Sequence, residues 1–117
     1  MKTLIGNHKN AEAITLDVLD ESSRIKAIKN ADIVVSMLPA RFHVEVAKDC
    51  ITYKKHMVTA SYVSDEMQAL DDDAKANGLI LMNEIGVDPG VDHMSAMHVL
   101  DRIRDKGGKI ILFESFT

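Results

Sequence analysis

The sequence predicts an α/β protein with a three-layer arrangement, in which helices flank both faces of a parallel sheet. Apolar, β-branched segments alternate along the chain with helical patterns, which is typical of a parallel sheet flanked by helices. Residues 33–38 form a nearly continuous apolar run, as expected for a strand covered on both faces. No Gly-x-Gly-x-x-Gly loop is present, because the glycines lie at positions 6, 78, 86, 90, 107 and 108.

Strands and helices are expected in regular alternation. The predicted strands are residues 13–18, 33–38, 57–60, 79–82 and 109–113. The predicted helices are residues 22–29, 43–54, 65–77 and 91–106, and residues 1–6 suit the tail of a preceding helix.

Capping residues support the helix boundaries. Asn30 suits a left-handed C-terminal cap for the first helix, in which Ile25 and Ile28 share one face. Ser64 suits the N-cap of the third helix, and Gly78 is expected to end it. The last helix carries an apolar stripe and is expected to end at a pair of glycines: Ala96, Val99, Leu100 and Ile103, then Gly107 and Gly108.

Residues 84–94 are the most informative segment, because they pack three carboxylates, an imidazole, two glycines and a proline between a strand and a helix. Asp88-Pro89-Gly90 is expected to form a tight turn, with proline fixing φ at the first central position and glycine accepting a positive φ at the second. A strand that ends in such a turn brings its charged groups to one edge of the sheet, where open α/β proteins bind ligands.

Composition excludes several classes of partner. The net charge is −4 with acids and bases interspersed, so neither a nucleic-acid-binding stripe nor a basic membrane patch is expected. No apolar run approaches the roughly 20 residues that span a bilayer. The single Cys50 has no partner for an internal disulfide, which favours a reducing compartment, the cytoplasm.

Polar and small residues follow four of the predicted strands, at Asp17, at residues 36–40, at residues 59–62 and at residues 83–86. The carboxyl ends of parallel strands meet at one edge, so a ligand cleft is expected there. The absence of a Gly-x-Gly-x-x-Gly loop has two possible interpretations. Either the chain is not a nucleotide-binding domain, or the first strand–helix unit of such a domain is missing from it.

Three motifs resemble those of the saccharopine dehydrogenases (saccharopine reductases), which act on the secondary amine joining lysine to glutamate or a related keto acid. The motifs are Ser36-Met37-Leu38-Pro39 with His43, Val58-Thr59-Ala60-Ser61-Tyr62-Val63-Ser64, and Asn83 through Asp88-Pro89-Gly90 to His93. The resemblance implies that residues 1–108 are part of an NAD- or NADP-binding domain with a Rossmann-like parallel sheet that lacks its first glycine-rich βαβ unit. It implies that residues 109–117 are the first strand of a catalytic domain that is otherwise absent.

The resemblance also implies site residues. The cofactor-binding residues would be Asp17, Val18, Leu38, Pro39, Ala60, Ser61 and Tyr62. The substrate-binding residues would be Ala40, Ser61, Glu84, Asp88 and His93, with Asp92 shaping the same junction. Ala40 departs from the tyrosine often found after that proline in the family. The substrate would be a small molecule of the amino-acid class, namely saccharopine, and no acid or base is assigned.

Other readings stay open at several positions. His43 either contacts the cofactor or begins a helix, and Asp88 and Asp92 either serve the site or cap the turn and helix. His93 and His98 are five residues apart, about 140° around a helix, which does not suit a metal pair, and no metal is expected.

The chain by itself is expected to be inactive and to self-associate into homo-oligomers through an exposed sheet edge. The alternatives to an enzyme are a free-standing, non-catalytic α/β module for ligand binding or regulation, and an interaction domain.

Overall fold

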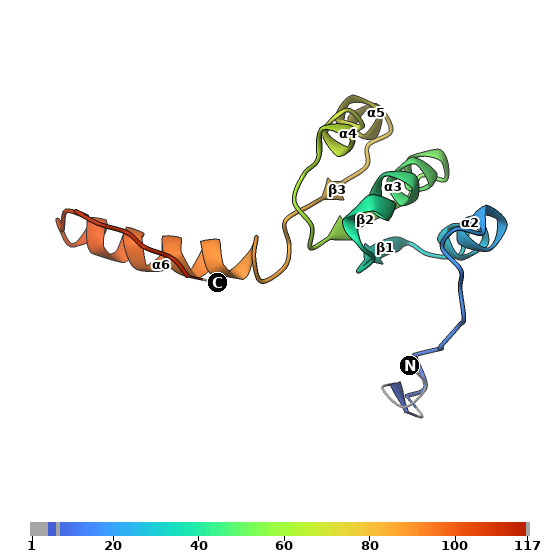
Figure 1. The fold of residues 1–117 in the computed structure, drawn as a ribbon, viewed down its shortest axis with the longest axis horizontal. Helices are drawn as coiled ribbons and strands as arrows, with labels where there is room; N and C mark the ends of the chain where they lie inside the picture. Colours follow the sequence, from blue (N-terminus) through green and yellow to red (C-terminus); the bar gives the residue numbers. More distant parts are fainter. Residues whose placement is uncertain (1–4, 7, 117) are drawn as a thin grey trace.

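The computed structural model describes residues 5, 6 and 8–116 of the chain, so most of the proposed helix tail at residues 1–6 lies outside the described residues. A small α/β unit carries a long helical arm on one side (Figure 1). The strands are β1 (Ile33–Ser36), β2 (His56–Thr59) and β3 (Leu81–Met82). The helices are α2 (Glu21–Lys29), η1 (Ala40–Phe42), α3 (His43–Thr52), α4 (Asp65–Gln68), α5 (Asp71–Ala76) and α6 (Val91–Asp105).

The sheet is parallel throughout, with the strand order β1-β2-β3. Val34 is opposite Met57, and Met57 is opposite Leu81, so these three side chains point to the same face. The predicted parallel α/β fold is therefore confirmed. Within the described residues, β1 forms one edge of the sheet.

Helix α3 covers one face of the sheet and provides most of the core. Its buried Val46, Ala47 and Cys50 pack with Met57 of β2 and with Ile28 of α2. The residues on the other face of the sheet are much more accessible: Ile33 is 52%, Val35 64% and Met82 46% exposed. The described residues thus supply one of the two helical layers that the sequence predicts.

Cys50 is fully buried in this core and forms no disulfide. Burial raises the pKa of its thiol to about 11, because the thiolate would lose its hydration, and the neighbouring Asp49 carboxylate adds to the effect. The thiol is therefore a packing group and is not a reactive nucleophile.

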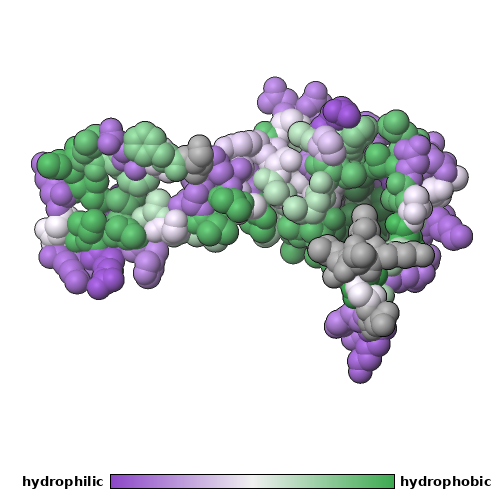
Figure 2. All heavy atoms as spheres, turned by 60° about the horizontal axis from the view of Figure 1, so that its bottom comes forward, coloured by the Kyte–Doolittle hydropathy of each residue, from purple (hydrophilic) through white to green (hydrophobic). Residues whose placement is uncertain are grey.

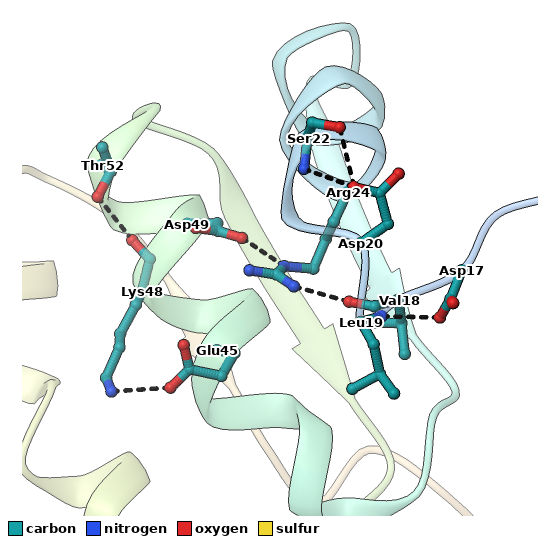
Figure 3. Close-up of polar contacts among 10 residues, drawn as sticks. All are labelled: Asp17, Val18, Leu19, Asp20, Ser22, Arg24, Glu45, Lys48, Asp49 and Thr52. Carbon is teal, nitrogen blue, oxygen red and sulfur yellow. Dashed lines mark hydrogen bonds and ion pairs between the residues drawn. The ribbon is translucent and has the colours of Figure 1, made fainter.

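A partly buried arginine joins α2 to α3 (Figure 3). Arg24 Nε donates to Asp49 Oδ2 at 2.6 Å, and Arg24 Nη1 donates to the Val18 carbonyl at 2.7 Å. Both charged side chains are at most 15% exposed, so this ion pair is shielded from water more than a surface pair. The contact holds residue 18 beside the first helix.

The remaining helix boundaries follow from local hydrogen bonds. Ser64 caps α4 by accepting from the Met67 amide, as predicted, and Asp20 caps α2 by accepting from the Ser22 amide. Gly78 has the positive φ of 66° expected at a helix end. Asn30 instead stays right-handed, with φ −84° and ψ −3°, so the predicted left-handed cap is wrong.

Several predicted elements are absent, shorter than expected or interrupted. Residues 13–18 and 109–113 form no strand, because no described strand pairs with them. The predicted strand at residues 79–82 is reduced to Leu81–Met82, and the helix at residues 65–77 is interrupted between α4 and α5.

Helix α6 extends away from the sheet, and the C-terminal segment runs back along it (Figure 1). None of its residues is buried, but the returning segment covers part of the predicted apolar stripe, because Ala96 and Leu100 are partly buried and line one pocket with Phe113. Figure 2 shows hydrophobic side chains gathered on one side of this arm. Val99, Ile111 and Leu112 are among the exposed apolar residues of α6 and the segment after it. No described helix is both long and apolar enough to cross a membrane.

Candidate functional site

The ends of β2 and β3 are joined by backbone hydrogen bonds, which create a rim of polar side chains. The Glu84 amide donates to the Ser61 carbonyl at 3.1 Å, and the Ile85 amide donates to the Thr59 carbonyl at 3.2 Å. The Glu84 carboxylate accepts from the Val63 amide at 3.2 Å. Glu84 has an unusual φ of 64°, so the chain turns sharply at this point. The predicted convergence of these two strand ends is therefore present.

A buried histidine joins the same rim to the end of β1. His43 Nδ1 lies 2.9 Å from Ser36 Oγ, and His43 Nε2 lies 2.8 Å from Ser61 Oγ and 3.0 Å from Thr59 Oγ1. Only 2% of His43 is exposed, and burial lowers the pKa of its imidazole. The ring is therefore neutral at pH 7, and hydroxyl groups from three segments surround it.

An apolar groove of about 440 Å³ lies beside β1 and α2. It brings together Val18 and Leu38, two of the predicted cofactor-binding residues, although they are 20 positions apart. The other lining residues are Leu16, Arg24, Ala27, Ile28, Val34, Val35, Ser36, Met37 and Val46. Ser36 lines this groove and also contacts His43, so the imidazole lies between the groove and the rim.

Two glycines allow the β3–α6 loop to lie close to other backbone. A Cβ atom at Gly86 would lie 2.8 Å from the Ala60 Cβ, which is closer than such atoms approach. Gly90 has a φ of 149° and pairs with Gly86 across the turn. The chain therefore turns here and Gly90 has the expected positive φ, but the turn covers residues 87–89, so Gly90 follows it and is not one of its central residues. The Asp88–Pro89 peptide bond is cis.

The loop gathers hydrogen-bonded acids at the start of α6. Tyr62 Oη donates to Asp88 Oδ1 at 2.8 Å, and this bond raises the pKa of the phenol. His93 Nδ1 lies 2.8 Å from Asp92 Oδ1, which also accepts from the Gly90 amide at 2.9 Å. This contact raises the pKa of His93 and lowers that of Asp92.

Asp88, Asp92 and His93 have potential ligand atoms within 4.8 Å of one another. Hydrogen bonds to Tyr62, to the Gly90 amide and within the Asp92–His93 pair already account for this proximity. The cluster alone therefore defines no metal centre.

The predicted site residues fall into three groups. Val18 and Leu38 lie in the groove, whereas Ser61, Tyr62, Glu84, Asp88 and His93 lie along the rim, with Ala60 against Gly86. Asp17, Pro39 and Ala40 are exposed. Pro39 and Ala40 begin η1, and the Asp17 carboxylate accepts from the Leu19 amide at 2.9 Å (Figure 3).

The sequence placed Ser36 and Thr59 among the strand-end residues of the expected cleft, but it assigned no binding role to either of them. Both are buried hydroxyls that contact His43. The available signal was the recurrence of small hydroxyl residues at two strand ends, together with a histidine at the start of a helix.

We expect His93 to titrate above its ordinary pKa of 6.5, because the Asp92 carboxylate stabilises the imidazolium. Since the folded pKa is raised, this pair contributes stability below pH 6.5 and loses it as the pH rises through the folded value. NMR titration of the ring will measure the shift, and Asp92→Asn should remove most of it. Asp101→Asn, farther along α6, should leave it in place, and a similar loss in both variants would disprove the pairing.

Known proteins resemble this chain over almost its whole length. Residues 2–82 match the model of the saccharopine dehydrogenase NADP binding domain. The chain is 44% identical over 98% of its length to an α-aminoadipic semialdehyde synthase of Arabidopsis thaliana, of which it covers 11%. It is 42% identical over 98% of its length to a saccharopine dehydrogenase [NADP(+), L-glutamate-forming] of Pyricularia oryzae, of which it covers 26%.

A solved structure agrees with these sequence matches. The apo saccharopine dehydrogenase (L-Glu forming) from Saccharomyces cerevisiae superposes with a TM-score of 0.77 at 38% identity. The match covers 93% of this chain and 24% of that one, so the chain spans about a quarter or less of the relatives it matches. Sequence motifs, parallel topology and structural similarity agree, and the chain belongs to the saccharopine dehydrogenase family, with residues 2–82 matching its NADP binding domain.

Proposed function

We propose that this chain forms the later half of the NADP-binding domain of an oxidoreductase that acts on the secondary amine of saccharopine. The observation that carries the proposal is the meeting of the ends of β1 and β2 and the loop after β2 around His43, beside an apolar groove, in a member of this family. The bound cofactor would supply hydride transfer to or from the amine-bearing carbon, and the protein would orient the reacting groups.

The residues present fit part of such a cofactor. The groove at Val18 and Leu38 offers apolar contact for the adenosine side. Asp17 and Pro39 are the exposed chain neighbours of these two residues and are proposed to contact the cofactor as well. Ala60, Ser61 and Tyr62 would lie beside the nicotinamide and its ribose, where two hydroxyls are able to donate or accept hydrogen bonds.

Ala40, Ser61, Glu84, Asp88 and His93 are proposed to face the amino-acid substrate. The carboxylates at this rim would favour the cationic amino groups of such a molecule. Residues 109–117 would lead into a catalytic domain, which would complete the site.

The pyrophosphate of a dinucleotide needs backbone amides from a glycine-rich loop, and this sequence contains no such loop. We therefore expect the 117-residue chain alone to bind NAD or NADP weakly and to be inactive. Calorimetric titration with both cofactors will measure the affinity, and sub-micromolar binding would contradict this expectation.

A second measurement tests the location of the site. Millimolar NADP should shift the NMR signals of Val18, Leu38, Ser61 and Tyr62, while signals of α5 stay unchanged. Shifts confined to other surfaces, or no shifts at all, would disprove the proposed cofactor site.

We further propose that the isolated chain self-associates through β1 in a reducing, cytoplasmic setting. Support comes from the exposed Val35 on an unpaired sheet edge, and from the buried, unpaired Cys50. Sedimentation should reveal concentration-dependent assembly that Val35→Lys weakens, because a charged side chain disfavours edge pairing. Val99→Lys on α6 is the control, and assembly that depends only on this second position would assign the contact to the arm.

A further inference from the structure

His43 has an unusual set of neighbours for a buried titratable side chain. Its ring contacts three hydroxyl groups, Ser36 Oγ at one nitrogen and both Thr59 Oγ1 and Ser61 Oγ at the other. These hydroxyls come from the end of β1, the end of β2 and the loop that follows β2. A single imidazole therefore holds three chain segments together.

The two hydroxyls at Nε2 compete for one ring atom. A neutral imidazole has one N–H group and one lone pair, so an unprotonated Nε2 accepts well from one hydroxyl at a time. Thr59 is 2% exposed, whereas Ser61 is only partly buried. Thr59 is thus enclosed with the ring, and Ser61 is the member of the pair that a ligand is able to reach.

We propose that His43 is a positioning residue that holds the Ser61 hydroxyl at the rim and links it to Ser36 in the apolar groove. The inference rests on the proposed cofactor site. When a nicotinamide nucleotide forms a hydrogen bond with the Ser61 hydroxyl, the Thr59 hydroxyl keeps its hydrogen bond to His43 Nε2. The buried ring therefore always has a partner at this nitrogen. Ligand binding at the rim therefore changes the hydrogen bonding of the His43 ring.

The hydrogen bonds of His43 favour a role in positioning Ser61 over a role in capping the N-terminus of α3. His43 is the first residue of α3, but its side chain makes no capping bond to that helix and points to the two strand ends instead. Its loss would leave two buried hydroxyls, those of Ser36 and Thr59, without their ring partner.

The test follows the ¹⁵N signals of the His43 ring in the 117-residue chain during titration with nicotinamide mononucleotide. We expect the nucleotide to shift the backbone amides of Ala60, Ser61 and Tyr62 and, in parallel, the Nε2 signal. Ser61→Ala should abolish the Nε2 response and weaken binding roughly fivefold, the value of one hydrogen bond. Thr52→Ala, which removes an exposed hydroxyl from α3, should preserve both. Amide shifts without any Nε2 response would overturn the inference.

A second comparison works without ligand and separates this inference from the proposed function. His43→Gln retains a polar group near the place of Nε2, and His43→Asn retains one near the place of Nδ1. If His43 positions Ser61, the Gln variant should keep the wild-type Ser61 Cβ signal and the Asn variant should not. Equal disturbance in both would overturn the positioning role. Failure of the nucleotide to shift any amide would disprove the cofactor site alone.

Discussion

Replacing Gly90 with alanine will break the loop that joins β3 to α6. The added Cβ would lie 2.2 Å from the Gly86 carbonyl oxygen and 2.7 Å from the Gly86 nitrogen, and both are backbone atoms that cannot rotate away. The φ of 149° at Gly90 is also unfavourable for alanine. We expect a local cost above the roughly 1–3 kcal/mol of a strained φ alone.

Amide hydrogen exchange measures this effect directly. The Gly86 amide donates to the Pro89 carbonyl, and the Val91 amide donates to the Gly86 carbonyl, so both should lose protection in Gly90→Ala. Gly78→Ala is the matched control, because φ is 66° there and no atom lies within 4 Å of the added Cβ. It should cost about 1 kcal/mol and leave the loop protected. Unchanged protection of Gly86 and Val91 in Gly90→Ala would contradict the loop geometry.

Met57→Ala should produce the largest loss of global stability. Met57 is 1% exposed at the centre of the sheet, between Val34 and Leu81, and belongs to a small core. Removing its side chain should cost about 2–5 kcal/mol. That is a large part of the roughly 5–15 kcal/mol that stabilises a typical domain.

Urea denaturation will measure the loss as a lower midpoint. Met82→Ala is the matched control, since this methionine lies on the neighbouring strand but is 46% exposed. It should cost less than about 1 kcal/mol, in line with surface positions. An equal loss in the free energy of unfolding for Met57→Ala and Met82→Ala would contradict the assignment of Met57 to the core.

The sequence predicted the strands that have partners within the chain and failed where the partner is missing. The runs at residues 33–38 and 57–60 correspond to β1 and β2, which pair with each other. Residues 13–18 and 109–113 have the same strand-like composition but remain unpaired in the described part of the chain. Strand formation depends on a neighbouring ladder of hydrogen bonds, which local composition does not report.

The candidate site was predictable only in part, for a related reason. The order of strand ends predicts that Ser61 and Glu84 lie at one edge, and their backbone groups are bonded there. The contacts of His43 depend on how α3 packs across two strands, and no sequence spacing reports that angle. Asp17 was expected at the same edge, but it belongs to an unpaired segment and its carboxylate bonds to its own turn.

Because α6 extends away from the sheet, a small rotation at its first residue moves its last residue by a much larger distance. At about 1.5 Å per residue, its 15 residues reach about 22 Å, so a rotation of roughly 10° at the base displaces the tip by about 4 Å. The backbone torsions between Val87 and Gly90 set the direction of α6, and so the position of any residues attached to its far end. A small change in these torsions would therefore displace the C-terminal end of α6 by several times more than it displaces the loop itself.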